Sequence, residues 1–289
     1  MDPAMRGRMH QARSYVEHYQ LGEPMEGSAI GEVTASNDPA FAAGDLVMSS
    51  LGWREFYNAP GSRLRKVDPK GLPLQALLGI AGSTGLTAYA GLVRIAEIKA
   101  GDVVFVSAAA GAVGSAACLI AKLKGCEVIG SAGGPDKVRF LQEELGIEKV
   151  IDYRAVHSVS RALAQAAPDG IDVYFDNVGG DHLEAAIARA KTFARFAICG
   201  MISAYNATEP PRAPANLLRM PSKRLKLQGF LLHDHMDLLP AFQQELAAWH
   251  AAGTLKWRET VFEGIEHAPD AFLGLFTGAN VGKTLVRLG

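Results

Sequence analysis

The chain has 289 residues, of which 48% are hydrophobic and 20% charged, and its formal net charge is −1. This composition is typical of a globular protein with a sizeable core, and the length suits two domains. A near-neutral chain lacks the basic field that nucleic-acid binding uses, so we expect no nucleic-acid partner. No apolar run reaches the roughly 18 residues that span a bilayer, and no signal peptide is evident, which favours a cytoplasmic protein.

The cysteines and histidines do not form a metal-binding pattern. Cys118, Cys126 and Cys199 lie in apolar segments and are too few for a four-cysteine zinc site. The eight histidines show none of the usual zinc spacings. Residues 233–235 (HDH) are the densest group of ligand types, but neighbours on an extended segment point in opposite directions. The sequence therefore predicts no metal site and thiols in a reducing compartment.

The amino-terminal part of the chain has all-β patterning. Residues 22–68 are rich in glycine and proline and contain two short strand candidates, 29–33 and 45–48. Such short strands between turn residues are typical of barrel-like domains.

Residues 101–232 alternate short apolar runs with helix-like stretches, the signature of a parallel sheet with crossover helices. We predict helices over 113–124, 135–145, 159–166 and 182–190. The predicted strands cover 103–106, 127–130, 149–151, 171–175, 193–199 and 225–231. Six strands with helices between them make a complete doubly wound nucleotide-binding domain, the Rossmann fold.

The carboxyl-terminal strand candidates, 259–262 and 283–287, return to the β domain. The predicted fold is therefore α/β, with a Rossmann domain over 76–254 inserted into a discontinuous β domain of residues 1–75 and 255–289. Ligands usually bind in the cleft between such domains.

A phosphate-binding loop follows the strand 103–106. Small residues let the backbone close on a pyrophosphate, and Gly114 allows the next helix to pack tightly. The first glycine of the usual Gly-x-Gly-x-x-Gly pattern is replaced by Ala109. The residues expected to bind the cofactor here are Ala110, Gly111, Ala112, Val113 and Gly114.

The cofactor is predicted from the end of the second strand. NAD enzymes place an acid about 20 residues after the loop, but this chain has Ser131 there, then Ala132 and two glycines, with Lys137 close by. Backbone amides around Gly133, a serine hydroxyl and an ammonium group suit a 2′-phosphate. The prediction is NADPH, although Lys137 alone would be interpreted as an exposed helix lysine.

Several motifs together resemble one family. SAAAGAVGS (107–115), GSAGG (130–134) with Lys137, and FDNVGG (175–180) look like the zinc-free, NADP-dependent double-bond reductases. This branch of the medium-chain dehydrogenase/reductases includes prostaglandin, 2-alkenal and curcumin reductases. The resemblance extends from DPAMR (2–6) through GSTGLTAY (82–89) to GANVGK (278–283).

The resemblance implies roles for individual residues. Lys137 and Tyr153 match the positions that hold the 2′-phosphate, and Tyr205 matches a tyrosine near the substrate carbonyl, the one catalytic residue that we expect. Met25 matches a cleft-lining, substrate-side residue. Outside the family context, Tyr153 and Tyr205 would be interpreted as surface aromatics, Cys199 as packing and Asn280 as a turn residue. The remaining positions that match cofactor contacts are Asn177, Cys199, Phe230, Leu231, Leu232 and Asn280.

The resemblance also implies a GroES-like β-barrel for the discontinuous domain and a homodimer formed through the edge of the Rossmann sheet. Two departures stand out. Family members have additional strands ahead of the Asp2-Pro3 motif, so we expect an N-terminally shortened β domain. The family often has a tyrosine at the position of Ala4, so the carbonyl-binding role falls more heavily on Tyr205.

The expected activity is reduction of the carbon–carbon double bond of an α,β-unsaturated aldehyde or ketone, an enone-type small molecule, by hydride transfer from NADPH to the β-carbon. The enzyme would then be an NADP-dependent oxidoreductase that acts on CH–CH groups. Two alternatives stay open: an NADPH quinone reductase of the zeta-crystallin-like branch, and a truncated, non-catalytic NADPH-binding protein.

Overall fold

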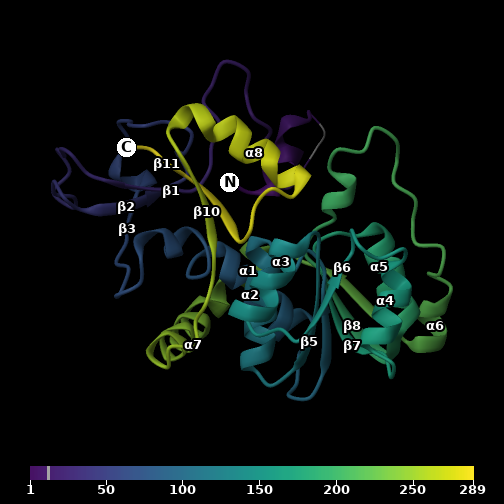
Figure 1. Ribbon diagram of the computed structural model, residues 1–289. Helices are drawn as coiled ribbons and strands as arrows, with labels where there is room; N and C mark the ends of the chain where they lie inside the picture. Colours follow the sequence, from purple (N-terminus) through teal and green to yellow (C-terminus); the bar gives the residue numbers. More distant parts are fainter. Residues whose placement is uncertain (12–13) are drawn as a thin grey trace. The chain divides into compact units, whose positions relative to one another are not determined.

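The computed structural model describes residues 1–11 and 14–289 (Figure 1). Contacts divide the chain into two compact units, one made of 1–82 and 259–289 and the other of 83–258. Our domain boundaries at residues 75 and 255 stay a prediction. No helix among the described residues is long and apolar enough to cross a membrane.

Unit 83–258 contains a six-stranded, wholly parallel sheet in the order β6-β5-β4-β7-β8-β9. The order reverses between β4 and β7, as in a doubly wound fold, so the predicted Rossmann architecture is confirmed. Each predicted strand is present. The strands are β4 (Val103–Val106), β5 (Glu127–Ala132), β6 (Lys149–Asp152), β7 (Ile171–Asp176), β8 (Ala190–Ile198) and β9 (Lys226–Gly229).

Helices α4 and α5 pack together and bury a core in which Phe105, Tyr174 and Phe196 project from neighbouring strands. α2 packs on β4 and β5 and also against α1, beside which it lies in Figure 1. The helices of this unit are α1 (Ser83–Ala90), α2 (Ala112–Leu123), α3 (Pro135–Arg139), α4 (Val159–Ala166), α5 (Gly180–Arg189), α6 (Arg219–Lys223) and α7 (Leu239–Ala251).

One predicted helix differs in detail. The stretch 135–145 is α-helical only over α3 and continues as a π-helical turn, Phe140–Glu144. A second π turn, Gly91–Ile95, extends α1. The shorter 3₁₀ turns of the described chain are Pro3–Met9, Gly61–Arg63, Leu74–Leu78, Ile202–Ala204, Leu232–Leu238 and Ile265–His267.

The other unit has two small sheets. β1 (Ala29–Glu32), β2 (Leu46–Ser49) and β3 (Arg65–Lys66) form an antiparallel sheet. β10 (Glu259–Glu263) and β11 (Lys283–Arg287) pair in parallel and are joined through α8 (Ala268–Thr277). Met5 packs with Phe272 and Leu275 of α8 in the core of this unit.

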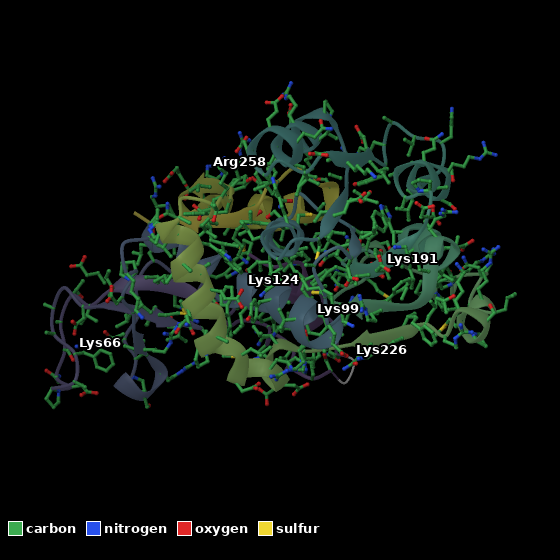
Figure 2. All side chains as sticks on the ribbon, turned by 90° about the horizontal axis from the view of Figure 1, so that it is seen from below. Lys66, Lys99, Lys124, Lys191, Lys226 and Arg258 are labelled. Carbon is green, nitrogen blue, oxygen red and sulfur yellow. The ribbon has the colours of Figure 1, made fainter. Side chains whose placement is uncertain are left out.

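Ion pairs occupy much of the exposed basic surface of unit 83–258. The amines of Lys124 and Lys191 lie 2.7 Å from carboxylate oxygens of Glu245 and Asp172, respectively. Lys226 and Arg258, labelled with them in Figure 2, pair with Glu97 and Glu144. Because these pairs are exposed or only half-buried, each contributes only about 0–1 kcal/mol to stability.

Candidate functional site

The loop after β4 has the geometry of a phosphate cradle. Ala108 has a positive φ of 47°, a conformation that costs a non-glycine residue roughly 1 kcal/mol, and its carbonyl accepts the N–H of Gly111. The turn delivers the chain directly into α2. Ala112, Val113 and Gly114 form the first turn of α2, whose N–H groups have no acceptor within a helix. The loop therefore presents backbone donors to an anion.

Gly114 is required by close packing. A Cβ at this position would lie 2.2 Å from the carbonyl oxygen of Ala108, whereas one at Gly111 would lie 3.2 Å from the same atom. The loop and the first turn of α2 thus touch backbone to backbone. Ala110 is almost fully buried beneath the loop.

The strands β4 and β7 are joined at their carboxyl ends, where the sheet order reverses. The side chain of Asn177 donates to the carbonyl oxygen of Ser107 over 2.8 Å, and the Ser107 hydroxyl accepts the N–H of Asn177 over 2.9 Å. In a doubly wound sheet this reversal opens the crevice in which nucleotides bind. Asn177 is therefore held in place at the expected position.

Asp176 organises the turn beside Asn177. Its Oδ1 accepts the hydroxyl of Tyr174 at 2.7 Å and the N–H groups of Val178 and Gly179 at 2.8 Å each. Its Oδ2 is buried without a hydrogen-bond partner. Burial raises the pKa of the Asp176 carboxyl, and the donors around Oδ1 counteract that rise.

A cationic cradle surrounds Gly133, just beyond β5. A Cβ at Gly133 would lie 2.6 Å from Cζ of Tyr153 and 3.0 Å from Nε of Arg154, so both side chains lie over this glycine. Lys137 is half-buried nearby. Burial lowers the pKa of the Lys137 ammonium, and the guanidinium of Arg154 lowers it further.

The nearest carboxylate is already engaged by the backbone. Asp152 accepts the N–H groups of Gly134 and Arg154, each at 3.0 Å. Lys137 forms no ion pair with a carboxylate in residues 1–11 or 14–289. Lys137 and the neighbouring Arg154 both carry positive charge, which attracts an anion. The cradle thus fits the 2′-phosphate of NADPH, and Arg154 is a member that the sequence had not indicated.

Ser131 lies on β5, two residues before Gly133. Its side chain is fully buried, and Oγ lies 2.9 Å from Nε2 of His182. The Ser131 hydroxyl is thus bonded to His182, and its expected contact with the 2′-phosphate stays a prediction. His182 was absent from the sequence prediction.

The segments after β8 and β9 carry further cofactor candidates and the catalytic candidate Tyr205. The N–H groups of Cys199 and Gly200 both donate to the carbonyl oxygen of Asp176, which ties β8 to the turn after β7. A Cβ at Gly200 would lie 2.8 Å from the hydroxyl of Tyr205. The Tyr205 phenol therefore lies over Gly200, on the same edge of the sheet as Asn177.

Phe230 follows β9 and packs edge-on against Phe175, with ring centroids 6.4 Å apart. Gly91 leaves room for this pair, since a Cβ there would approach both rings within 2.7 Å. Leu231 and Leu232 come directly after Phe230, and Leu231 is 37% exposed. The three residues thus form a partly apolar rim beyond β9.

Met25 and Asn280 belong to the other unit. Met25 packs against the cluster of Met5, Phe272 and Leu275. The side chain of Asn280 donates to the carbonyl oxygen of Gly282 over 2.9 Å, which holds it in the turn before β11. Their expected contacts with substrate and cofactor stay predictions.

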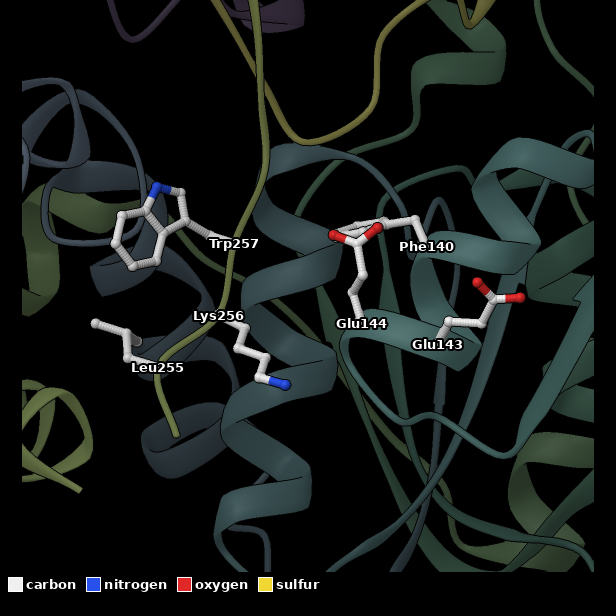
Figure 3. A pocket seen from close by; sticks show the side chains of 6 residues that line it. All are labelled: Phe140, Glu143, Glu144, Leu255, Lys256 and Trp257. Carbon is white, nitrogen blue, oxygen red and sulfur yellow. The ribbon is translucent and has the colours of Figure 1, made fainter. Parts of the chain in front are cut away.

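A cavity of about 320 Å³ is lined by residues other than these site candidates (Figure 3). Glu143 and Glu144 line it from the π turn after α3, and Lys256 lines it from the segment after α7. Glu144 is paired with Arg258. Among the residues described, no three His, Cys, Asp or Glu side chains gather as metal ligands.

Comparisons with known proteins agree with this architecture. A family model described as the N-terminal domain of oxidoreductase matches residues 1–67, and one described as zinc-binding dehydrogenase matches residues 112–248. A putative NADP-dependent oxidoreductase, YfmJ of Bacillus subtilis, is 44% identical over all of this chain and 85% of its own length. The NADP⁺-dependent 2-alkenal reductase of Nicotiana tabacum is 42% identical over 99% of this chain and 84% of its own.

A solved structure gives the same result. CurA of Vibrio vulnificus in complex with NADPH superposes with a TM-score of 0.93 at 39% identity, covering 99% of this chain and 86% of its own. The class defined is a medium-chain dehydrogenase/reductase. Within that class, this chain belongs to the NADP-dependent double-bond reductase branch, as the sequence motifs had indicated.

Proposed function

We propose that this chain catalyses the NADPH-dependent reduction of the carbon–carbon double bond of α,β-unsaturated aldehydes and ketones. The observation that carries the proposal is the pairing of two neighbouring cations beside Gly133, Lys137 and Arg154, with a phenol over Gly200 on one edge of the same sheet. The similarity to a 2-alkenal reductase and to an NADPH-bound CurA supports it.

In this proposal the chain binds the two ends of the cofactor with different groups. The first turn of α2 offers its N–H groups to the pyrophosphate, and Lys137, Tyr153 and Arg154 hold the 2′-phosphate. Asn177 orients the ribose on the nicotinamide side, with Cys199 and the segment 230–232 beside the ring. Asn280 is a further proposed cofactor contact.

NADPH, when bound, supplies a hydride to the β-carbon of the substrate. Negative charge then develops on the substrate carbonyl oxygen, where a positioned hydrogen-bond donor stabilises it. We assign that donor to the Tyr205 hydroxyl. The α-carbon takes its proton from Tyr205 or from solvent, so the reaction needs no strong base. Met25 contributes to the substrate pocket in this proposal.

The test is NADPH consumption by the purified chain with medium-chain 2-alkenals and enones, compared with a p-quinone at the same concentration. We expect faster turnover of the alkenals, with loss of the double bond and retention of the carbonyl group. Bound NADPH without turnover on a broad panel would contradict the proposal, and a faster reaction with the quinone would assign the chain to the other branch.

We further propose a cytoplasmic homodimer. β9 forms one end of the sheet order, with no strand paired on its outer side among the described residues, and a second copy would cover that edge. Cys118 and Cys126 are buried thiols, which suits a reducing compartment. Light scattering on the purified chain should give twice the chain mass of 30.7 kDa.

A further inference from the structure

A buried histidine lies directly behind the proposed 2′-phosphate cradle. His182 is in the first turn of α5 and is only 6% exposed. Its Nε2 lies 2.9 Å from the Ser131 hydroxyl on β5, and its ring stacks on Phe105 of β4 with 10° between the planes. The imidazole is therefore fixed by two neighbouring strands.

The same ring supports Tyr153. The Tyr153 ring meets the imidazole edge-on, with centroids 5.5 Å apart and 82° between the planes. From the other direction the ring lies against Gly133, and the Tyr153 N–H donates to the carbonyl oxygen of Ala132 over 3.0 Å. Tyr153 is thus confined by Gly133 on one side and His182 on another, although 37% of it stays exposed.

His182 is suited to support Tyr153, and it adds no charge to the cradle around Gly133. Burial lowers the pKa of His182 to about 4, so the imidazole is neutral at neutral pH. A neutral imidazole has one donor and one acceptor nitrogen and can satisfy the buried Ser131 hydroxyl, which would otherwise be costly. An aliphatic side chain would leave that hydroxyl without a partner and give Tyr153 no ring to pack on.

We propose that His182 is a positioning residue for cofactor selection: anchored by Ser131, it holds Tyr153 over Gly133 and thereby sets the preference for a 2′-phosphate. The proposal rests on the NADPH-binding function proposed above. It concerns only the adenosine end of the cofactor, so it is separable from the reaction. Its consequence is that His182 affects binding of 2′-phosphorylated nucleotides and not of their unphosphorylated counterparts.

The experiment measures the Kd of 2′,5′-ADP and of 5′-AMP by calorimetry for the wild-type chain and its variants. His182→Ala should reduce the preference for 2′,5′-ADP about tenfold, because Tyr153 must then be ordered on binding at a cost of ~1.4 kcal/mol. His182→Phe keeps a ring for Tyr153 to pack on and should retain most of the preference. The control is Leu163→Ala. Leu163 is a residue of α4 in the buried core that also contains Phe105, so this substitution should lower stability and leave the preference for 2′,5′-ADP unchanged.

Ser131→Ala removes only the hydroxyl that anchors the imidazole. It tests the positioning role of His182 if His182→Ala does not fold. We expect it to reduce the preference about threefold, with 5′-AMP binding unchanged. A folded His182→Ala or Ser131→Ala chain that keeps the wild-type preference, or that loses both ligands equally, overturns the proposal. A wild-type chain that binds both ligands equally would overturn NADPH binding itself, and this inference with it.

Discussion

The charge around Gly133 gives the sharpest prediction at the scale of a single residue. Lys137 is half-buried, faces Arg154 and forms no ion pair with a carboxylate in the described chain. A hydrogen bond to a charged partner contributes roughly 1.5–3 kcal/mol, so Lys137→Gln should weaken NADPH binding roughly 10- to 100-fold. NADH, which has no 2′-phosphate, should bind with little change. Quenching of tryptophan fluorescence during nucleotide titration measures both affinities.

Lys149→Gln is the matched control for that substitution. Lys149 begins β6, at the amino-terminal end of the strand beside β5, and pairs with Glu127 at 2.6 Å. Its removal should leave both affinities unchanged. Equal losses for NADPH and NADH in Lys137→Gln would mean that the ammonium does not contact a 2′-phosphate.

His182 also predicts how stability depends on pH. Its pKa falls from the ordinary 6.5 to about 4 in the folded chain, mainly through burial, while the Asp181 carboxylate opposes the shift. Tyr153 and Ser131 are its polar neighbours from the adjoining strands. Between these pH values the unfolded chain binds more protons, so the contribution of His182 is complete above pH 6.5 and is lost as the pH falls toward 4.

The loss should reach at most roughly 3 kcal/mol in the free energy of unfolding. Urea denaturation at pH 7 and pH 4.5 measures it, and the comparison with His182→Phe separates it from the titration of carboxylates. The variant should lose less stability than the wild type over this interval. Identical losses in both chains would show that His182 is not the group responsible.

At the scale of an element, the contact between the phosphate loop and α2 depends on one glycine. Gly114→Ala places a Cβ 2.2 Å from the Ala108 carbonyl oxygen, which forces the backbone to move. Overpacking of this kind costs ~1–3 kcal/mol, which lowers the melting temperature by roughly 5 °C. Gly111→Ala is the matched comparison, because its Cβ would meet the same oxygen at a tight 3.2 Å that a shift of a few tenths of an ångström relieves, and its φ of −78° suits alanine. Thermal melts followed by circular dichroism should rank Gly114→Ala well below Gly111→Ala; equal shifts would mean that the loop relaxes freely.

The strands that could be predicted from the sequence are those marked by a short, continuous apolar run. The apolar runs of β4, β5 and β7 are buried on both faces, as parallel strands must be, and are recognisable from composition alone. α1 was missed because six of its eight residues are buried, so it has no polar face and no helical periodicity. The π turn after α3 is equally invisible to a pattern of period 3.6.

The site was predicted to the extent that it lies in contiguous motifs. The phosphate loop, Lys137 and Asn177 are motif residues, and the structure holds them at the carboxyl ends of neighbouring strands. The partner of Ser131 was not foreseeable, because His182 is 51 residues further along the chain and reaches it only through tertiary packing. The orientation of the Ser131 side chain follows from the alternation of β5, which directs it to the core with Ile129.

At the scale of the whole molecule, the two compact units differ in chain continuity. Residues 83–258 are continuous and contain the complete six-stranded sheet and most of the cofactor candidates, whereas the other unit is assembled from residues 1–82 and 259–289. A continuous unit with its own hydrophobic core is expected to fold alone. We therefore predict that a fragment of residues 83–258 folds cooperatively and binds 2′,5′-ADP within about threefold of the full chain's affinity, since the cradle residues all lie within it.

The same fragment should not reduce 2-alkenals at a measurable rate, because Met25 and Asn280 are absent from it. Far-UV circular dichroism during urea denaturation measures folding, and calorimetry measures binding. The Lys137→Gln substitution in the fragment is the control and should weaken 2′,5′-ADP binding as it does in the full chain. A fragment that stays unfolded would mean that the residues outside 83–258 are part of the folding unit. A folded fragment that reduces alkenals at the full rate would place the whole substrate site in the Rossmann unit and remove Met25 and Asn280 from it.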